Sequence, residues 1–99
     1  AESFFRARDQ VQSLQLAPPV QLRLAIEKHV EVITNDVNAS AVFQHEWRHL
    51  SEPDLSVFKS MRAEYEAYFM DILSRGKQAG HFQIENEKLA VLGLLSALN

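Results

Sequence analysis

Residues 62–82 read RAEYEAYFMDILSRGKQAGHF, and this stretch decides the fold because its apolar residues recur at helical spacing. The apolar stripe extends upstream as well, and its members are Leu55, Phe58, Met61, Tyr65, Tyr68 and Ile72, with Phe69 and Leu73 widening it. Gly80 follows the last periodic residues, where a left-handed C-terminal cap is expected. The sequence therefore predicts one long helix over residues 53–79 with a broad aromatic face.

The segment Ser51-Glu52-Pro53-Asp54 separates this helix from the one before it. Ser51 is a favoured N-cap residue, and Asp54 lies three residues on, where a capping box returns the bond. Pro53 is tolerated in a first turn. We therefore expect the long helix to be capped by Ser51.

The rest of the chain also has helical periodicity, and no segment alternates apolar and polar residues as a half-buried strand would. Further helices are expected over residues 3–16, 19–37 and 41–50, and from residues 85–87 to the end. The second of these has an apolar stripe made of Leu22, Ile26, His29, Val30, Ile33 and Val37. The predicted fold class is all-α, a bundle of about five helices.

Composition excludes several functions for these 99 residues, which are 46% apolar, 23% charged and carry a net charge of -3. Without a basic patch, the segment is not expected to bind nucleic acid by itself. The absence of cysteine excludes disulfides and thiolate sites. No signal peptide or membrane span is visible, and we expect a cytoplasmic protein. The chain starts at Ala1 and stops in an apolar run at Asn99, so we interpret it as a piece of a longer protein.

His45-Glu46-Trp47-Arg48-His49 matches H-E-x-x-H, in which a helix presents two imidazoles to zinc beside a glutamate base. Catalytic zinc also needs a third protein ligand, and no metzincin-type histidine follows. Arg48 puts a charge inside the motif. We therefore expect polar helix positions around one buried Trp47, without a metal or catalytic residues. A zinc hydrolase with His45 and His49 as ligands is kept as an alternative.

The run from Leu89 to Leu98 is apolar on all sides, which is typical of a helix buried on every face. The small residues Ala90, Gly93 and Ala97 let another helix approach closely. One chain of this length cannot cover the whole helix, so we expect a second subunit to do so. The predicted dimer interface consists of Ala90, Gly93, Leu94 and Ala97.

The order of these segments resembles the C-terminal ligand-binding and dimerisation domain of TetR/AcrR-family transcriptional regulators. The resemblance covers residues 19–99. It is carried by HEWRHL, then SEPDL, then a long helix whose Gly76 and Gly80 precede Phe82, and a final NEKLAVLGLLSALN. The Glu-x-Arg-x-Leu pattern of one subgroup is matched by Glu46, Arg48 and Leu50.

The resemblance implies a homodimer that binds operator DNA through an N-terminal helix-turn-helix domain outside this chain, without contact with a membrane. Residues 1–16 would lead in from that domain, and residues 17–99 would form an effector-binding and dimerisation domain that lacks its last helix. A small apolar or acyl-type effector would modulate DNA binding, with no cofactor.

The residues predicted to line the effector site are His29, Ile33, Phe43, Trp47, Met61, Tyr65 and Phe69, with His29 and Tyr65 as hydrogen-bonding anchors. The same residues also fit a core without any ligand, because aromatic residues are core by default and a stripe histidine is often bonded to a neighbour. A ligand-free helical interaction module is therefore the other alternative.

Overall fold

The computed structural model describes residues 2–98, except for the side chains of Ala39, Phe43 and Gln44. This part of the chain contains five α-helices, one short 3-10 helix and no strand, which confirms the predicted all-α class. The elements are α1 Glu2–Ser13, α2 Pro18–Asn35, α3 Val37–Gln44, the 3-10 helix η1 Glu46–His49, α4 Asp54–Gln78 and α5 Glu87–Leu98. Among these residues, each helix is too short or too polar to cross a membrane.

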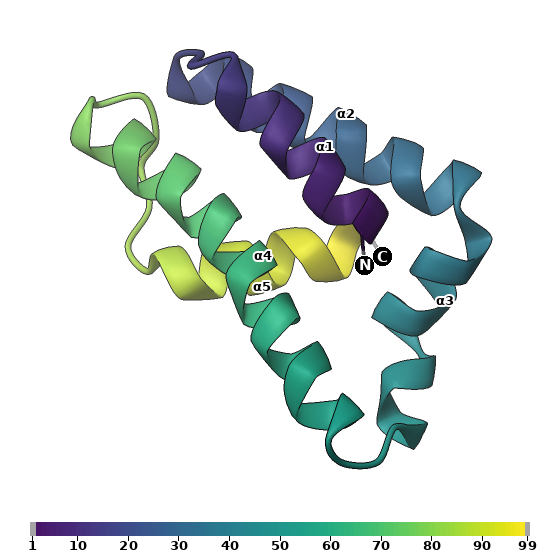
Figure 1. The fold of residues 1–99 in the computed structure, drawn as a ribbon. Coiled ribbons are helices and arrows are strands. Elements are labelled where there is room, and N and C mark those ends of the chain that lie inside the picture. Colours follow the sequence, from purple (N-terminus) through teal and green to yellow (C-terminus); the bar gives the residue numbers. More distant parts are fainter. Residues whose placement is uncertain (1, 99) are drawn as a thin grey trace.

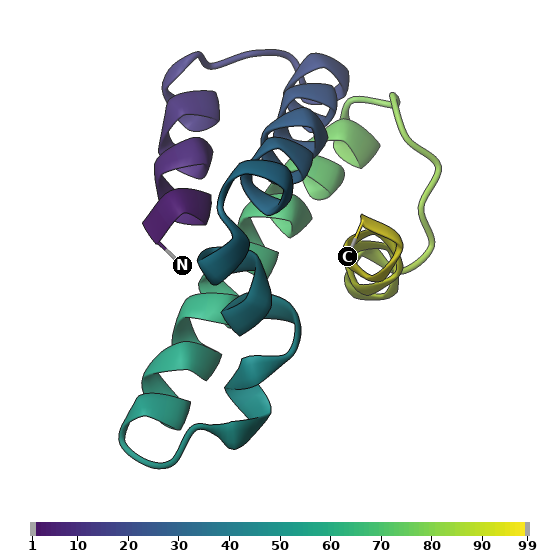
Figure 2. The same cartoon turned by 90° about the vertical axis from the view of Figure 1, so that its right-hand side faces the viewer.

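Helices α2 and α4 form the middle of the molecule. Figure 2 shows α1 on one side of them and α5 on the other. In Figure 1, α3 and η1 descend from the end of α2 and return to the start of α4, so these elements frame an open triangle that α5 crosses behind. Below, α3 and η1 together are called the arm. This arrangement gives α4 neighbours on several faces.

Helix α4 supplies most of the core because it packs against α2 and α1 as well as α5. Its buried residues are Phe58, Tyr65, Tyr68, Phe69, Ile72, Leu73 and Gly76. Phe4 and Val11 of α1, Ala25 of α2 and Val91 and Leu95 of α5 complete the core. The predicted stripe of the long helix is confirmed over most of its length, while Leu55 and Met61 at its first turns are half-buried.

The stripe predicted for α2 was wrong in part. The buried residues are Gln21, Ala25 and His29, one position before most of the predicted set. Val30 is 40% and Val37 73% exposed. Small Ala25 lets α1 and α4 approach, and Gln21 is buried because its Oε1 accepts a hydrogen bond from Arg75 of α4. Helix α2 therefore buries a small and polar face that a count of apolar residues overlooks.

Some of the observed helix ends and caps differ from the predicted ones. Helix α4 starts at Asp54 after Pro53 without a side-chain cap, so the predicted Ser51 cap was wrong. Gly80 has a φ of 81°, which confirms the predicted left-handed cap. The side chain of Asn86 accepts the Leu89 N–H at 3.0 Å and so caps α5. Helix α3 begins at Val37, four residues before the predicted 41.

Phe82 folds back onto Gly76 after the turn at Gly80. A Cβ added at Gly76 would lie 2.2 Å from two carbons of the Phe82 ring. Both the His81 and the Phe82 N–H donate to the Gly76 carbonyl, at 2.8 and 3.3 Å, and so hold the turn against the helix. Gly76 is therefore required by the close approach of one ring.

We predict that Gly76→Ala destabilises the fold by about 1–3 kcal/mol, because the Phe82 ring must be displaced. In a Phe82→Ala background the same substitution should stabilise by about 0.5–1 kcal/mol, because alanine favours a helix interior more than glycine does. Urea unfolding of the four proteins in this double-mutant cycle measures both effects. An equal cost of Gly76→Ala in the two backgrounds would contradict the contact.

Candidate functional site

A hydrogen-bonded pair of polar side chains lies at the centre of the core. His29 Nδ1 of α2 lies 2.9 Å from Tyr65 Oη of α4, and the imidazole tautomer determines which group donates. The exposed fractions are 0% for His29 and 1% for Tyr65. The two residues predicted as polar anchors are therefore in contact, and each is a hydrogen-bonding partner of the other. They are called the interior pair below.

Aromatic rings enclose the interior pair. The Phe4 ring of α1 lies 5.2 Å from His29 and 5.4 Å from Tyr65, between ring centroids. Phe69 lies 6.4 Å from His29 and 5.5 Å from Tyr65, edge-on to both. Phe4 was not among the predicted site residues. Its position on an apolar face of the first helix was visible, but the sequence gives no sign that this face covers His29.

Trp47 joins the arm to α4. Its indole is half-buried and stacks on Phe58, with 6.0 Å between centroids and 8° between ring planes. The guanidinium carbons of Arg48 and Arg62 each lie 5.2 Å from the Trp47 ring centroid. Trp47 therefore contacts an aromatic ring and two cations at once.

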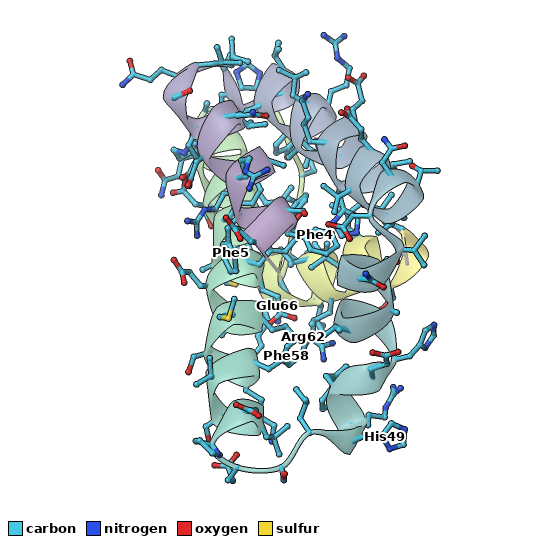
Figure 3. All side chains as sticks on the ribbon, turned by 45° about the vertical axis from the view of Figure 1, so that its right-hand side comes forward. Phe4, Phe5, His49, Phe58, Arg62 and Glu66 are labelled. Atoms are coloured by element: carbon cyan, nitrogen blue, oxygen red, sulfur yellow. The ribbon has the colours of Figure 1, made fainter. Side chains whose placement is uncertain are left out.

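Arg62 and Glu66 belong to the same region but were not predicted as site residues. The Arg62 Nε lies 3.8 Å from the Glu66 Oε2, and the two side chains are 39% and 24% exposed. In Figure 3, Phe58, Arg62 and Glu66 project from α4 into the space between α4 and the arm, whereas His49 points outward. Phe58, Arg62 and Glu66 lie one turn apart on the same face of α4. This i, i+4 spacing was the sequence signal that could have placed them together.

The remaining predicted residues divide between these two regions. Ile33 is half-buried and packs against the core, and Met61 is half-buried on α4. The side chain of Phe43 lies outside the described residues. The structure thus brings His29, Tyr65 and Phe69 together in the core and places Trp47 in a second cluster with Phe58.

The HEWRH segment does not form an α-helix. His45 lies in a turn, and Glu46–His49 form a 3-10 helix in which positions three residues apart are aligned. Residues four apart, such as His45 and His49, then do not share a face, and both are exposed. Within residues 2–98, as far as they are described, no three His, Asp or Glu side chains are grouped to hold a metal ion.

The predicted dimer residues divide between two sides of α5. Ala90 and Leu94 are half-buried against the core, whereas Gly93 and Ala97 are exposed. A Cβ at Gly93 would have no atom within 4 Å apart from its chain neighbours and the backbone of its own helix. Leu89 is 65% and Leu92 37% exposed. One apolar face of α5 is therefore uncovered within the described chain.

Three of the surface hollows that described residues line lie elsewhere. The largest, of about 340 Å³, lies between the α1–α2 turn and α4, and its lining is Gln12, Gln15, Leu16, Gln21, Asp71 and Arg75. Two smaller ones, of about 140 and 160 Å³, share Ser3, Glu31 and Val32 between α1 and α2. Residues from the predicted effector site do not line these three hollows.

Both tyrosines of the chain are held in the neutral form. Burial raises the pKa of Tyr68 to about 12, although the nearby Arg8 charge opposes this shift. Burial also raises the pKa of Tyr65, and the neighbouring Tyr68 adds to the shift. Unfolded tyrosine ionises near pH 10, so the folded state disfavours a charge that the unfolded chain accepts. The resulting stability is complete below pH 10 and is lost as the pH rises toward 12 and beyond.

We predict that alkaline titration produces no tyrosinate near pH 10 while the helices persist. Tyrosinate absorbance should instead rise together with the loss of helical circular dichroism at higher pH. Tyr65→Phe should leave one titrating phenol with the same behaviour. A tyrosinate signal that is half complete near pH 10 in the folded protein would contradict the burial of these side chains.

The model of the tetracycline repressor-like C-terminal domain matches residues 15–99, so the match begins after the end of α1. No curated protein and no solved structure gives a significant match. Domains of this family are regulatory rather than enzymatic, in agreement with the prediction that the chain is not an enzyme. The chain belongs to the family of tetracycline repressor-like C-terminal domains.

Proposed function

We propose that the chain is the effector-binding and dimerisation part of a one-component transcriptional regulator that works in the cytoplasm. A small ligand of apolar or acyl type binds among α2, the arm and α4. It changes operator affinity through a helix-turn-helix domain that precedes these residues in a longer protein. The observation that carries this proposal is the interior pair, which is enclosed by residues of three helices.

The ligand region is the side of α4 that faces the arm. Trp47 and Phe58 provide apolar surface there, and the half-buried Trp47 leaves part of its ring for a ligand. Tyr65, one turn beyond Met61 on α4, leads from this surface to the interior pair. A ligand seated against Met61 and Trp47 would thus press on side chains that contact the core.

The interior pair links that region to α1. Phe4 of α1 contacts both His29 and Tyr65, and all three side chains are enclosed. Close-packed interiors respond to displacement by switching between discrete arrangements. A shift of Tyr65 toward or away from His29 therefore has to move Phe4. Because α1 leads toward the proposed DNA-binding domain, this contact transmits the effector signal.

A charged contact couples α1 to α4 a second time. The Arg8 guanidinium donates to Glu64 of α4 at 2.9 Å and lies 4.6 Å from the Phe5 ring centroid. The Arg8 side chain is only 17% exposed. Helix α1 is therefore held to α4 by rings in the core and by an ion pair at its edge, so the two helices move together.

The uncovered face of α5 supports the dimer. Leu89 and Leu92 are exposed apolar side chains on this helix, and Gly93, one turn beyond Leu89, leaves room for the backbone of a neighbour. A symmetric dimer would bury this patch against its own copy. The predicted contact residues Gly93 and Ala97 are the small members of the face.

We predict that the effector signal passes through Phe4. In the full-length protein, Phe4→Leu should keep binding of an acyl ligand within about threefold, because the substituted side chain lies away from Trp47 and the apolar volume is nearly conserved. The change in operator affinity caused by the ligand should fall from the usual 5- to 150-fold range to about twofold or less. Thermal shift with medium-chain acyl and aromatic compounds measures binding, and fluorescence anisotropy on an operator selected from random DNA measures the coupling.

Phe5→Leu is the matched control. Phe5 is the neighbouring ring on α1 and lies 6.1 Å from Tyr65, but it is half-buried and packs under Arg8. This variant should retain the coupling. Equal loss in both variants would contradict transmission through the interior pair. A full-length gene without an upstream helix-turn-helix would contradict the regulator, and no thermal shift with any compound would favour the ligand-free module.

We also predict that the dimer depends on the size of residue 93. Gly93→Leu should leave the fold of each subunit intact, because Gly93 is exposed and a Cβ added there meets no packed neighbour within 4 Å. In the dimer it should be overpacked at a cost of about 1–3 kcal/mol per site. Light scattering over a concentration series should show dissociation at higher protein concentration than for the unmodified protein. Gly93→Ala is the milder control, and an unchanged dissociation constant for Gly93→Leu would exclude this face from the interface.

A further inference from the structure

Arg62 forms an ion pair with Glu66 that leaves its hydrogen-bond donors available. Its Nε lies 3.8 Å from Glu66, which is longer than a hydrogen bond. Arg8 and Arg75, in contrast, donate to carboxylates at 2.9 Å. Among the described residues no other carboxylate pairs with Arg62. The Arg62 guanidinium is thus oriented by its neighbours without being neutralised through direct hydrogen bonds.

The contact with Trp47 orients the same group. The Arg62 guanidinium carbon lies 5.2 Å from the Trp47 ring centroid, within the range of cation–π attraction. Such a contact does not consume the N–H groups, which lie in the guanidinium plane. With Glu66 near the Nε edge, the two terminal nitrogens form a fork that matches the oxygens of a carboxylate or a phosphate.

The local charge favours an anion over a cation. Two guanidiniums, of Arg48 and Arg62, approach the Trp47 ring, and the Glu66 carboxylate pairs with Arg62. These three side chains together carry one positive charge, and the exposed Arg48 contributes only a screened part of it. Arg62 is 39% and Glu66 24% exposed, so the charge lies in a partly enclosed setting where its attraction is screened less than at an open surface.

The side chains beside Arg62 offer apolar surface to the rest of a ligand whose anionic group binds there. Phe58 and Arg62 project from the same face of α4 toward the arm (Figure 3). Phe58 stacks on Trp47 within this space. A ligand whose oxyanion bonds to Arg62 could therefore lay an acyl or aromatic body along Phe58 and Trp47.

We propose that the effector carries a terminal oxyanion, a carboxylate or a phosphate, and that the Arg62 fork, oriented by Trp47 and Glu66, is its binding group. This inference rests on the proposed effector-binding function and adds the charge of the ligand to it. Arg62 contacts the ligand, and Glu66 is a positioning residue.

The test uses four octyl compounds with one chain and different head groups: octanoate, octyl phosphate, the neutral octanamide and the cationic octylammonium. Trp47 is the sole tryptophan of the 99 residues, so its fluorescence reports binding beside Arg62 directly. Octanoate or octyl phosphate should bind at least about tenfold more tightly than octanamide, because bonds to a charged partner are worth this much. Octylammonium should bind most weakly.

Three variants assign the effect to Arg62. Arg62→Gln should reduce the preference for the anion over octanamide to about one, with octanamide binding unchanged. Arg62→Lys keeps the charge but loses the fork, so it should retain only part of the preference. Arg48→Gln is the matched control, since Arg48 lies at the same 5.2 Å distance from the Trp47 ring but is exposed. It should keep the preference within about twofold, as expected for a screened surface charge.

The outcomes separate this inference from the proposed function. Equal binding of octanoate and octanamide, a preference for octylammonium, equal losses in Arg62→Gln and Arg48→Gln, or no fluorescence change with any compound would each overturn the anion site. Arg62-dependent binding that leaves operator affinity unchanged would instead support the site and contradict the regulator. Whichever oxyanion binds more tightly identifies the head group.

Discussion

The hydrogen bond between His29 and Tyr65 is the constraint on which the rest of the structure depends. Burying a polar group without a partner costs about 1–3 kcal/mol, and the bond between His29 and Tyr65 offsets this cost for a polar atom of each. This bond fixes α2 against α4 at one register. The rings of Phe4 and Phe69 then exclude water from the bond. The position of α1 follows, because Phe4 is the residue that covers the pair.

The helices could be predicted from the sequence because their signals are local. Residues of α4 repeat at helical spacing over 25 residues, and Gly80 supplies a backbone conformation that other residues avoid. The buried face of α2 could not be predicted, since burial of Gln21 depends on Arg75, which is 54 residues away in sequence. HEWRH had the letters of a zinc helix, but the chain forms a turn at His45 and a 3-10 helix after it. The conformation of such a short segment is determined by its tertiary contacts rather than by its own sequence pattern.

Those residues of the candidate site that lie on an apolar stripe could be predicted from the sequence. Tyr65 and Phe69 belong to the α4 stripe, and His29 was recognised as a polar residue among apolar ones. Arg62 and Glu66 were missed because an i, i+4 pair of opposite charges is the usual pattern of a solvated helix face. Only the position of the arm opposite α4 shows that this pair is partly enclosed. The sequence contains no local signal for that packing.

The two polar groups near α4 differ in what they offer to a ligand. The interior pair is hydrogen-bonded and fully buried, so a ligand that bonded to His29 or Tyr65 would have to open the surrounding rings. Arg62 needs no such rearrangement, because its terminal donors face a partly exposed space. In the proposed function, recognition at Arg62 and a response at the interior pair are separate steps along α4. Arg62 and Tyr65 are three residues apart on this helix, so their side chains are neighbours on its surface. The proposed effector would therefore act from Arg62 on Tyr65, and through it on His29 and Phe4, without touching the pair.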